Sequence, residues 1–96
     1  MEREDTGRQV DAYVDRSREE LVALCARLVA AGSVNPPGHT TGPADVVRDF
    51  LAVRGLHSET LAQVEEKPNL VAATEGHGPG RHLVLNGHLD TIPPGE

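Results

Sequence analysis

The stretch from Leu83 to Pro93 reads LVLNGHLDTIP and carries the clearest fold signal in the chain. Its first three residues are apolar, which predicts a strand over residues 81–85 that is covered on both faces. The run Asn86 to Asp90 follows directly, so we expect it at the C-terminal end of that strand. Ligands and catalytic groups of α/β sheets collect at this end of the strands. The stretch therefore predicts both an α/β fold and the position of a site.

His88 and Asp90 are the residues of this stretch with the most specific chemistry. In an extended chain they share one face, with Cα atoms about 6.6 Å apart. A histidine is a common zinc ligand, and a nearby carboxylate accepts a hydrogen bond from its other ring nitrogen and so fixes the tautomer. Gly87 leaves room for a ligand to approach closely. The His-x-Asp pattern alone, without its flanking residues, is more typical of an exposed histidine at a strand end.

Helices are predicted upstream of this motif. Apolar residues at helical spacing favour either one long helix from about 9 to 31 or two helices that break near Ser17. Gly32 is suited to end this region in the left-handed conformation. Pro43 is suited to the first position of a second helical element, which Gly55 closes.

Strands are predicted between the helices and the motif. The segment 56–64 alternates weakly, as an edge strand does, and the apolar run 69–74 indicates a second strand. Residues 76–80 read GHGPG, which is typical of a turn, and we expect them to connect a hairpin. The predicted fold class is α/β, with two helices followed by two or three strands.

Composition excludes several function classes. The 96 residues hold 9 basic and 15 acidic side chains, a net charge of −6, and only 2% aromatic residues. A nucleic-acid footprint and a polybasic membrane anchor are therefore not expected. No apolar run approaches the roughly 20 residues that span a bilayer. We expect a soluble, cytoplasmic protein with a disordered segment over 1–8. Cys25 lies on the apolar stripe of the first helical region and is predicted to be a buried core thiol.

Three segments of the chain resemble one family of metallopeptidases. The stretch Leu83–Pro93 resembles the first metal-ligand motif of the zinc aminoacylase, acetylornithine deacetylase and succinyl-diaminopimelate desuccinylase family, which includes the glutamate carboxypeptidases. The segment Ser33–Gly38, SVNPPG, is similar to the family's helix-connecting loop. The segment Pro68–Ala72, PNLVA, is similar to its first well-formed strand. The resemblance covers roughly residues 17–96.

The resemblance implies that residues 9–96 are the incomplete N-terminal portion of a zinc-peptidase catalytic domain that hydrolyses amide or peptide bonds. It implies that His88 binds one of two zinc ions, for which cobalt or manganese can substitute, and that Asp90 is an active-site residue that orients His88. The implied substrate is a small N-acyl amino acid or peptide, with no nucleic acid or membrane as partner. The complete enzyme is implied to be a homodimer formed through a further domain.

Part of the family's site has no counterpart in these residues. A bridging Asp, a Glu pair, a further acidic ligand and a late His are all missing, so we expect this chain to be inactive on its own. The rival hypotheses are a non-catalytic remnant or small binding module, and a different metallohydrolase that uses His-x-Asp. The remaining histidines lack the spacing of zinc ligands and are predicted to be exposed: His39, His57, His77 and His82.

Overall fold

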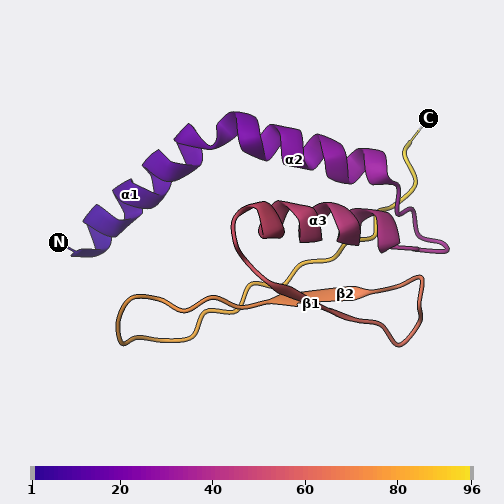
Figure 1. Cartoon of the computed structure of the whole chain (residues 1–96). Coiled ribbons are helices and arrows are strands. Elements are labelled where there is room, and N and C mark those ends of the chain that lie inside the picture. Colours follow the sequence, from indigo (N-terminus) through magenta and orange to yellow (C-terminus); the bar gives the residue numbers. More distant parts are fainter. Residues whose placement is uncertain (1, 96) are drawn as a thin grey trace.

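The computed structural model describes residues 2–95, and over this range it has three helices and one two-stranded sheet (Figure 1). The elements are α1 (Glu2–Arg16), α2 (Arg18–Ala31), α3 (Thr41–Val53), β1 (Ser58–Leu61) and β2 (Asn69–Ala72). α3 lies in the middle, with α2 packed along one side and both strands along the other. The mixed α/β class is confirmed.

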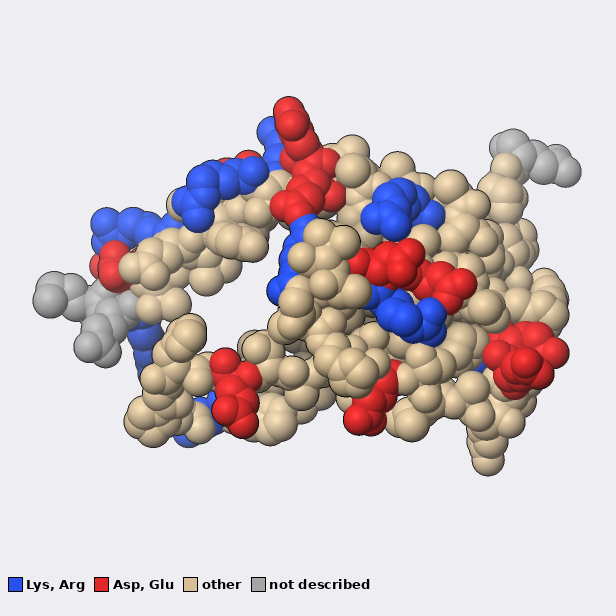
Figure 2. Space-filling model, in the orientation of Figure 1, with Lys and Arg blue, Asp and Glu red and all other residues tan. Residues whose placement is uncertain are grey.

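The first helical region consists of two helices. The chain leaves helical geometry at Ser17, so the interpretation with a break near this residue is confirmed. The described residues therefore form three helices, one more than the two in the predicted fold class. Residues 2–8, which we expected to be disordered, form the first turns of α1, and Met1 lies outside the described residues. From residue 3 to its end α1 is exposed, and it extends away from α3 with open space beneath it (Figure 2).

Two glycines end the helical elements where the sequence predicts. Gly32, after α2, has a φ of 70°, and Gly55, just past α3, has a φ of 74°. These backbone conformations strain residues that carry a Cβ. α3 begins at Thr41, so Pro43 lies within the first turn and not at the first position. The N–H groups of the whole first turn have no partner inside the helix, so the missing N–H of Pro43 costs no helical hydrogen bond.

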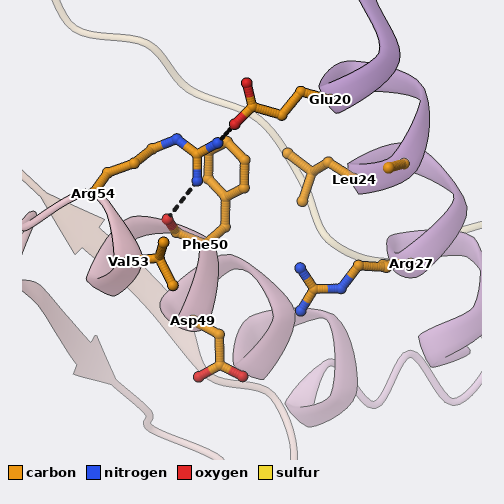
Figure 3. A pocket seen from close by; sticks show the side chains of 8 residues that line it. Glu20, Leu24, Arg27, Asp49, Phe50, Val53 and Arg54 are labelled. Carbon is orange, nitrogen blue, oxygen red and sulfur yellow. Dashed lines mark hydrogen bonds and ion pairs between the residues drawn. The ribbon is translucent and has the colours of Figure 1, made fainter. Parts of the chain in front are cut away.

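One cationic side chain joins α2 to α3. The Arg54 guanidinium forms an ion pair with Glu20 of α2 and lies 3.5 Å over the ring centroid of Phe50 (Figure 3). It also donates to the Phe50 carbonyl at 3.0 Å. A pocket lies beside these residues, between α2 and α3, and Leu24 of α2 lines it and is partly buried. Cys25, next to it in sequence, is exposed, so the prediction of a buried core thiol is wrong.

The sheet is a short antiparallel pair. Ser58 of β1 pairs with Ala72 of β2, and Leu61 pairs with Asn69. Both strands are shorter than the segments 56–64 and 69–74 in which they were predicted. We expected two or three strands, and the described residues form two.

The strand predicted over residues 81–85 is wrong. These residues have no ladder partner within residues 2–95, and the segment is irregular. Leu83, Val84 and Leu85 are 78%, 75% and 87% exposed. Since no strand follows it, the segment 76–80 is the tip of a long loop that returns toward α3, and not a hairpin connection (Figure 1).

The few buried residues gather at one place, where the loop after α2 meets the start of α3 and the start of β2. They are Ser33, Gly38, Thr40, Pro43, Ala44 and Pro68. On the face shown in Figure 2, acidic and basic side chains are interspersed. None of the helices formed by residues 2–95 has the length and apolar character needed to cross a membrane.

Candidate functional site

The loop after α2 is docked onto the segment that follows His88. Ser33 Oγ donates to the Leu89 carbonyl at 2.7 Å. The Asn35 N–H donates to the Thr91 carbonyl at 2.8 Å, and the Thr91 N–H donates to the Ser33 carbonyl at 3.0 Å. These bonds form a parallel bridge between Val34 and Thr91. Two of the three segments that carry the family resemblance are thus in direct contact.

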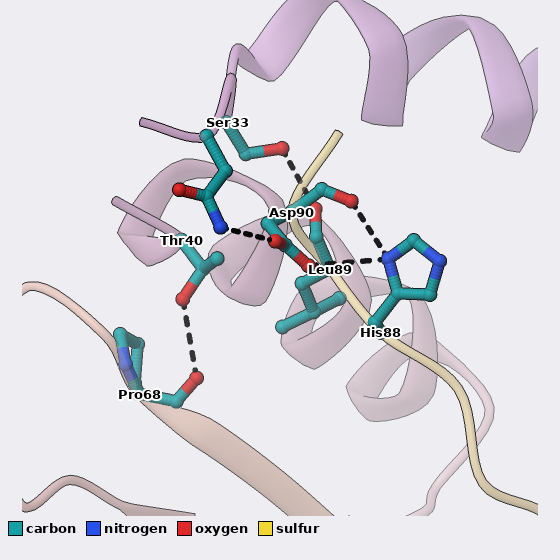
Figure 4. A network of polar contacts seen from close by, with 7 residues as sticks. Ser33, Thr40, Pro68, His88, Leu89 and Asp90 are labelled. Carbon is teal, nitrogen blue, oxygen red and sulfur yellow. Dashed lines mark hydrogen bonds and ion pairs between the residues drawn. The ribbon is translucent and has the colours of Figure 1, made fainter. Parts of the chain in front are cut away.

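The third segment joins the same place from β2. The Thr40 N–H donates to the Glu66 carbonyl at 2.9 Å, and its Oγ1 donates to the Pro68 carbonyl at 3.3 Å (Figure 4). Thr40 and Pro68 are both buried. The loop after α2 therefore connects the start of β2 to the His88 segment, and it holds that segment in place without a ladder of strand hydrogen bonds along residues 81–85.

The structure brings His88 and Asp90 together at the position that the sequence singles out. His88 Nδ1 lies 2.7 Å from the backbone carbonyl oxygen of Asp90 and 3.2 Å from its Oδ1 (Figure 4). Both oxygens are acceptors here, so a neutral ring carries its proton on Nδ1 and its lone pair on Nε2. The His88 side chain is 84% exposed, and its Nε2 points away from these partners.

The Asp90 carboxylate is shared between two partners. Its Oδ1 faces His88, and its Oδ2 accepts a hydrogen bond from Asn35 Nδ2 at 2.9 Å. The Asn35 amide is the main cause of a lowered pKa of Asp90, against a partial desolvation that raises it; the residue's own backbone and His88 lower it further. Asp90 is therefore an anion at neutral pH, as a carboxylate that orients a metal-binding histidine must be.

Sequence reasoning missed Asn35. Its contact with Asp90 joins residues 55 positions apart, and no local pattern predicts such a pair. The available signal was that Asn35 belongs to the SVNPPG segment, which resembles a family loop. When a loop and a distant motif both resemble segments of one family, the loop is a candidate for contact with the motif.

The chemistry of the described residues fits one ligand position of the zinc site that the resemblance implies. His88 offers a free ring nitrogen, and Asp90 fixes the ring, which is the donor chemistry that zinc uses. A catalytic zinc takes about three protein ligands. Within residues 2–95, no three or more His, Cys, Asp or Glu side chains gather as a metal-holding group. The other histidines are exposed, as expected: His39, His57, His77 and His82.

Comparison with curated proteins finds similarity to a protein named as a deformylase. The chain is 35% identical over 82 residues to N-formyl-4-amino-5-aminomethyl-2-methylpyrimidine deformylase of Halalkalibacterium halodurans. The aligned region covers 82% of this chain and 19% of that protein, so the chain spans about a fifth of the relative's length. No family model matches the chain. No solved structure matches it either.

Proposed function

We propose that this chain is the N-terminal part of a zinc-dependent hydrolase that cleaves amide bonds in small N-acyl molecules. The observation that carries the proposal is the contact of His88 Nδ1 with two oxygens of Asp90, since it leaves Nε2 available to a metal. The similarity to a deformylase supports the reaction class, because removal of a formyl group from nitrogen is hydrolysis of an amide. Deacetylase, desuccinylase and carboxypeptidase activities belong to the same chemistry.

Each residue of the site has a distinct part in this proposal. His88 provides one metal-binding nitrogen through Nε2. Asp90 accepts the Nδ1 proton, which holds the ring in one tautomer and makes Nε2 a better donor. Zinc, when bound, supplies a Lewis acid and a water of lowered pKa for attack on the amide carbonyl. The other metal ligands and the general base come from residues beyond those described, as the family resemblance implies.

The further properties implied by the resemblance belong to the same proposal. The complete enzyme holds two zinc ions, accepts cobalt or manganese in their place, and dimerises through a separate domain in the cytoplasm. The 96 residues alone neither turn over substrate nor bind zinc tightly, because they contribute a single ligand where about three are needed.

The test uses the complete product of the gene and the variant His88→Ala. Zinc content is measured by mass spectrometry of the metal, and hydrolysis is measured on N-formyl, N-acetyl and N-succinyl amines and on dipeptides. We expect His88→Ala to lose zinc and nearly all turnover. His82→Ala, an exposed histidine six residues earlier, is the matched control and should keep both. Full zinc content in His88→Ala, or no hydrolysis of any amide by the wild type, contradicts the proposal.

A further inference from the structure

The loop after α2 does more than connect two helices, because its side-chain contacts converge on one carboxylate. The backbone bonds from Ser33 and Asn35 to Thr91 align the loop with the segment 89–91. They bring the Asn35 side chain to the oxygen of Asp90 that does not face His88. With one oxygen held by the Asn35 amide, rotation of the Asp90 carboxylate is restricted, and its other oxygen stays directed at the imidazole.

Gly38 shows that the loop is built closely around the Asn35 side chain. Its φ is 72°, and its N–H donates to the Val34 carbonyl at 2.9 Å, which closes the turn. A Cβ at this position would lie 3.0 Å from Asn35 Cγ and 3.3 Å from Nδ2. A side chain at Gly38 would therefore displace the amide that holds Asp90. The backbone of the turn and the Asn35 side chain form one unit.

We propose that Asn35 is a positioning residue that sets the metal affinity of His88 through Asp90, with Gly38 holding the Asn35 amide in place. This inference rests on the proposed function. Within residues 2–95, Asn35 makes no hydrogen bond to His88, so its effect passes through the Asp90 carboxylate. Groups that hydrogen-bond a metal-binding histidine directly, as Asp90 does, typically change metal affinity or activity by about 10–100-fold, so the effect of Asn35 behind Asp90 should lie at the lower end of this range.

The experiment measures the zinc dissociation constant of the complete gene product by competition with a chelating dye. We expect Asn35→Ala to weaken zinc binding about tenfold. Asn35→Asp should weaken it further, because a second carboxylate then faces Asp90. Gln63→Ala, which removes an exposed carboxamide in the loop between β1 and β2, is the control and should bind zinc like the wild type. In hydrolysis, kcat should fall for Asn35→Ala while KM stays unchanged.

A double variant separates positioning from a general loss of structure. In the background Asp90→Ala, the further change Asn35→Ala should have no effect on the zinc dissociation constant, because the carboxylate through which Asn35 acts is gone. An equal loss in both backgrounds overturns the inference and marks Asn35 as a residue of the loop's fold. Wild-type zinc affinity in Asn35→Ala overturns it as well.

A measurement without any Asn35 variant covers the case in which those variants do not fold. In the NMR spectrum of the metal-free wild type, one side-chain amide proton of Asn35 should be shifted downfield by its bond to Asp90. Asp90→Ala should move it back, and an unmoved signal overturns the inference. If the wild type binds no zinc at all, the proposed function fails and the inference falls with it. Zinc binding that is insensitive to Asn35 overturns the inference alone.

Discussion

His88 and Asp90 are two positions apart in the chain, and the imidazole Nδ1 lies 3.2 Å from a carboxylate oxygen of Asp90 and 2.7 Å from its backbone carbonyl. The sequence argument for this contact assumed a strand, in which alternate side chains share a face. The structure forms the contact in an irregular segment instead. The pair therefore depends on the loop after α2, which is bonded to Leu89, Asp90 and Thr91.

Asp90→Asn tests whether the carboxylate charge matters to His88. The amide keeps the size and can still accept a hydrogen bond, so the fold should remain, but the negative charge that makes the imidazole a better ligand is lost. We expect kcat of the complete enzyme to fall at least about tenfold at saturating zinc, with weaker zinc binding. Asp11→Asn, on exposed α1, is the control. Wild-type kcat in Asp90→Asn would mean that Asp90 serves only the turn into Thr91.

Local features of this fold were predictable from sequence. The helix ends at Gly32 and Gly55 are set by a backbone preference that glycine carries alone. The short strand β2 follows from an apolar run bounded by Pro68. Such signals need no knowledge of distant parts of the chain.

Features that depend on distant partners were not predictable. A strand over 81–85 requires a neighbour to pair with, and within residues 2–95 none lies beside it. Whether Cys25 is buried depends on which side of α2 faces α3, and the side that carries Glu20 and Leu24 is the one that does. The contact of Asn35 with Asp90 is likewise made by folding and not by spacing.

Gly38→Ala should destabilise the loop after α2 and weaken zinc binding. Gly55→Ala is the matched control, because Gly55 has nearly the same φ, 74°, but open space where a Cβ would lie. Both variants carry the left-handed strain of about 1–2 kcal/mol. Only Gly38→Ala also pushes on Asn35, at 3.0 Å. We expect urea unfolding to show a loss of stability in both variants, and we expect the zinc dissociation constant to rise in Gly38→Ala alone. Equal zinc affinity in the two variants would argue against the close fit around Asn35.

Gly42→Ala should separate the end of α2 from the start of α3. A Cβ at Gly42 would lie 2.7 Å from the carbonyl oxygen of Ala31, a backbone atom that cannot turn aside. Overpacking of this kind typically costs about 1–3 kcal/mol. Gly7→Ala, in α1 with no atom near its would-be Cβ, should instead gain about 0.5–1 kcal/mol of helix stability. Urea midpoints of both variants measure the difference, and an unchanged midpoint in Gly42→Ala would contradict the close approach.

Arg54→Ala should loosen α2 from α3. The variant removes the ion pair with Glu20, the stacking on Phe50 and the bond to the Phe50 carbonyl. We expect a loss of about 1–2 kcal/mol in the free energy of unfolding. Arg54→Lys should recover little of it, because an ammonium cannot stack as a planar guanidinium does. Arg8→Ala, which breaks an exposed pair within α1, should cost at most about 0.5 kcal/mol. Similar losses of stability for Arg8→Ala and Arg54→Ala would mean that the contacts of Arg54 stabilise the fold no more than an exposed ion pair does.

The 96-residue chain on its own should associate and melt with little cooperativity. Its accessible surface is 8550 Å², against about 5,300 Å² for a compact monomer of this mass. Its radius of gyration is 16.0 Å, where about 12.5 Å is usual for this length. The extra surface includes the apolar segment Leu83–Leu85, whose backbone has no ladder partner within residues 2–95. Exposed apolar chain with free backbone groups pairs readily with another copy.

Sedimentation velocity at several concentrations measures this association, and two variants locate it. Leu83→Asp places a charge in the unpaired segment and should shift the chain toward the monomer. Val53→Asp places the same charge on α3, where the side chain is 85% exposed, and should leave association unchanged. If the two variants reduced association equally, general hydrophobicity would drive it. A pairing surface at Leu83–Leu85 would make association sensitive to Leu83→Asp and not to Val53→Asp. A wild-type chain that is monomeric at every concentration and melts in one sharp transition would show that the exposed segment is stable without a partner.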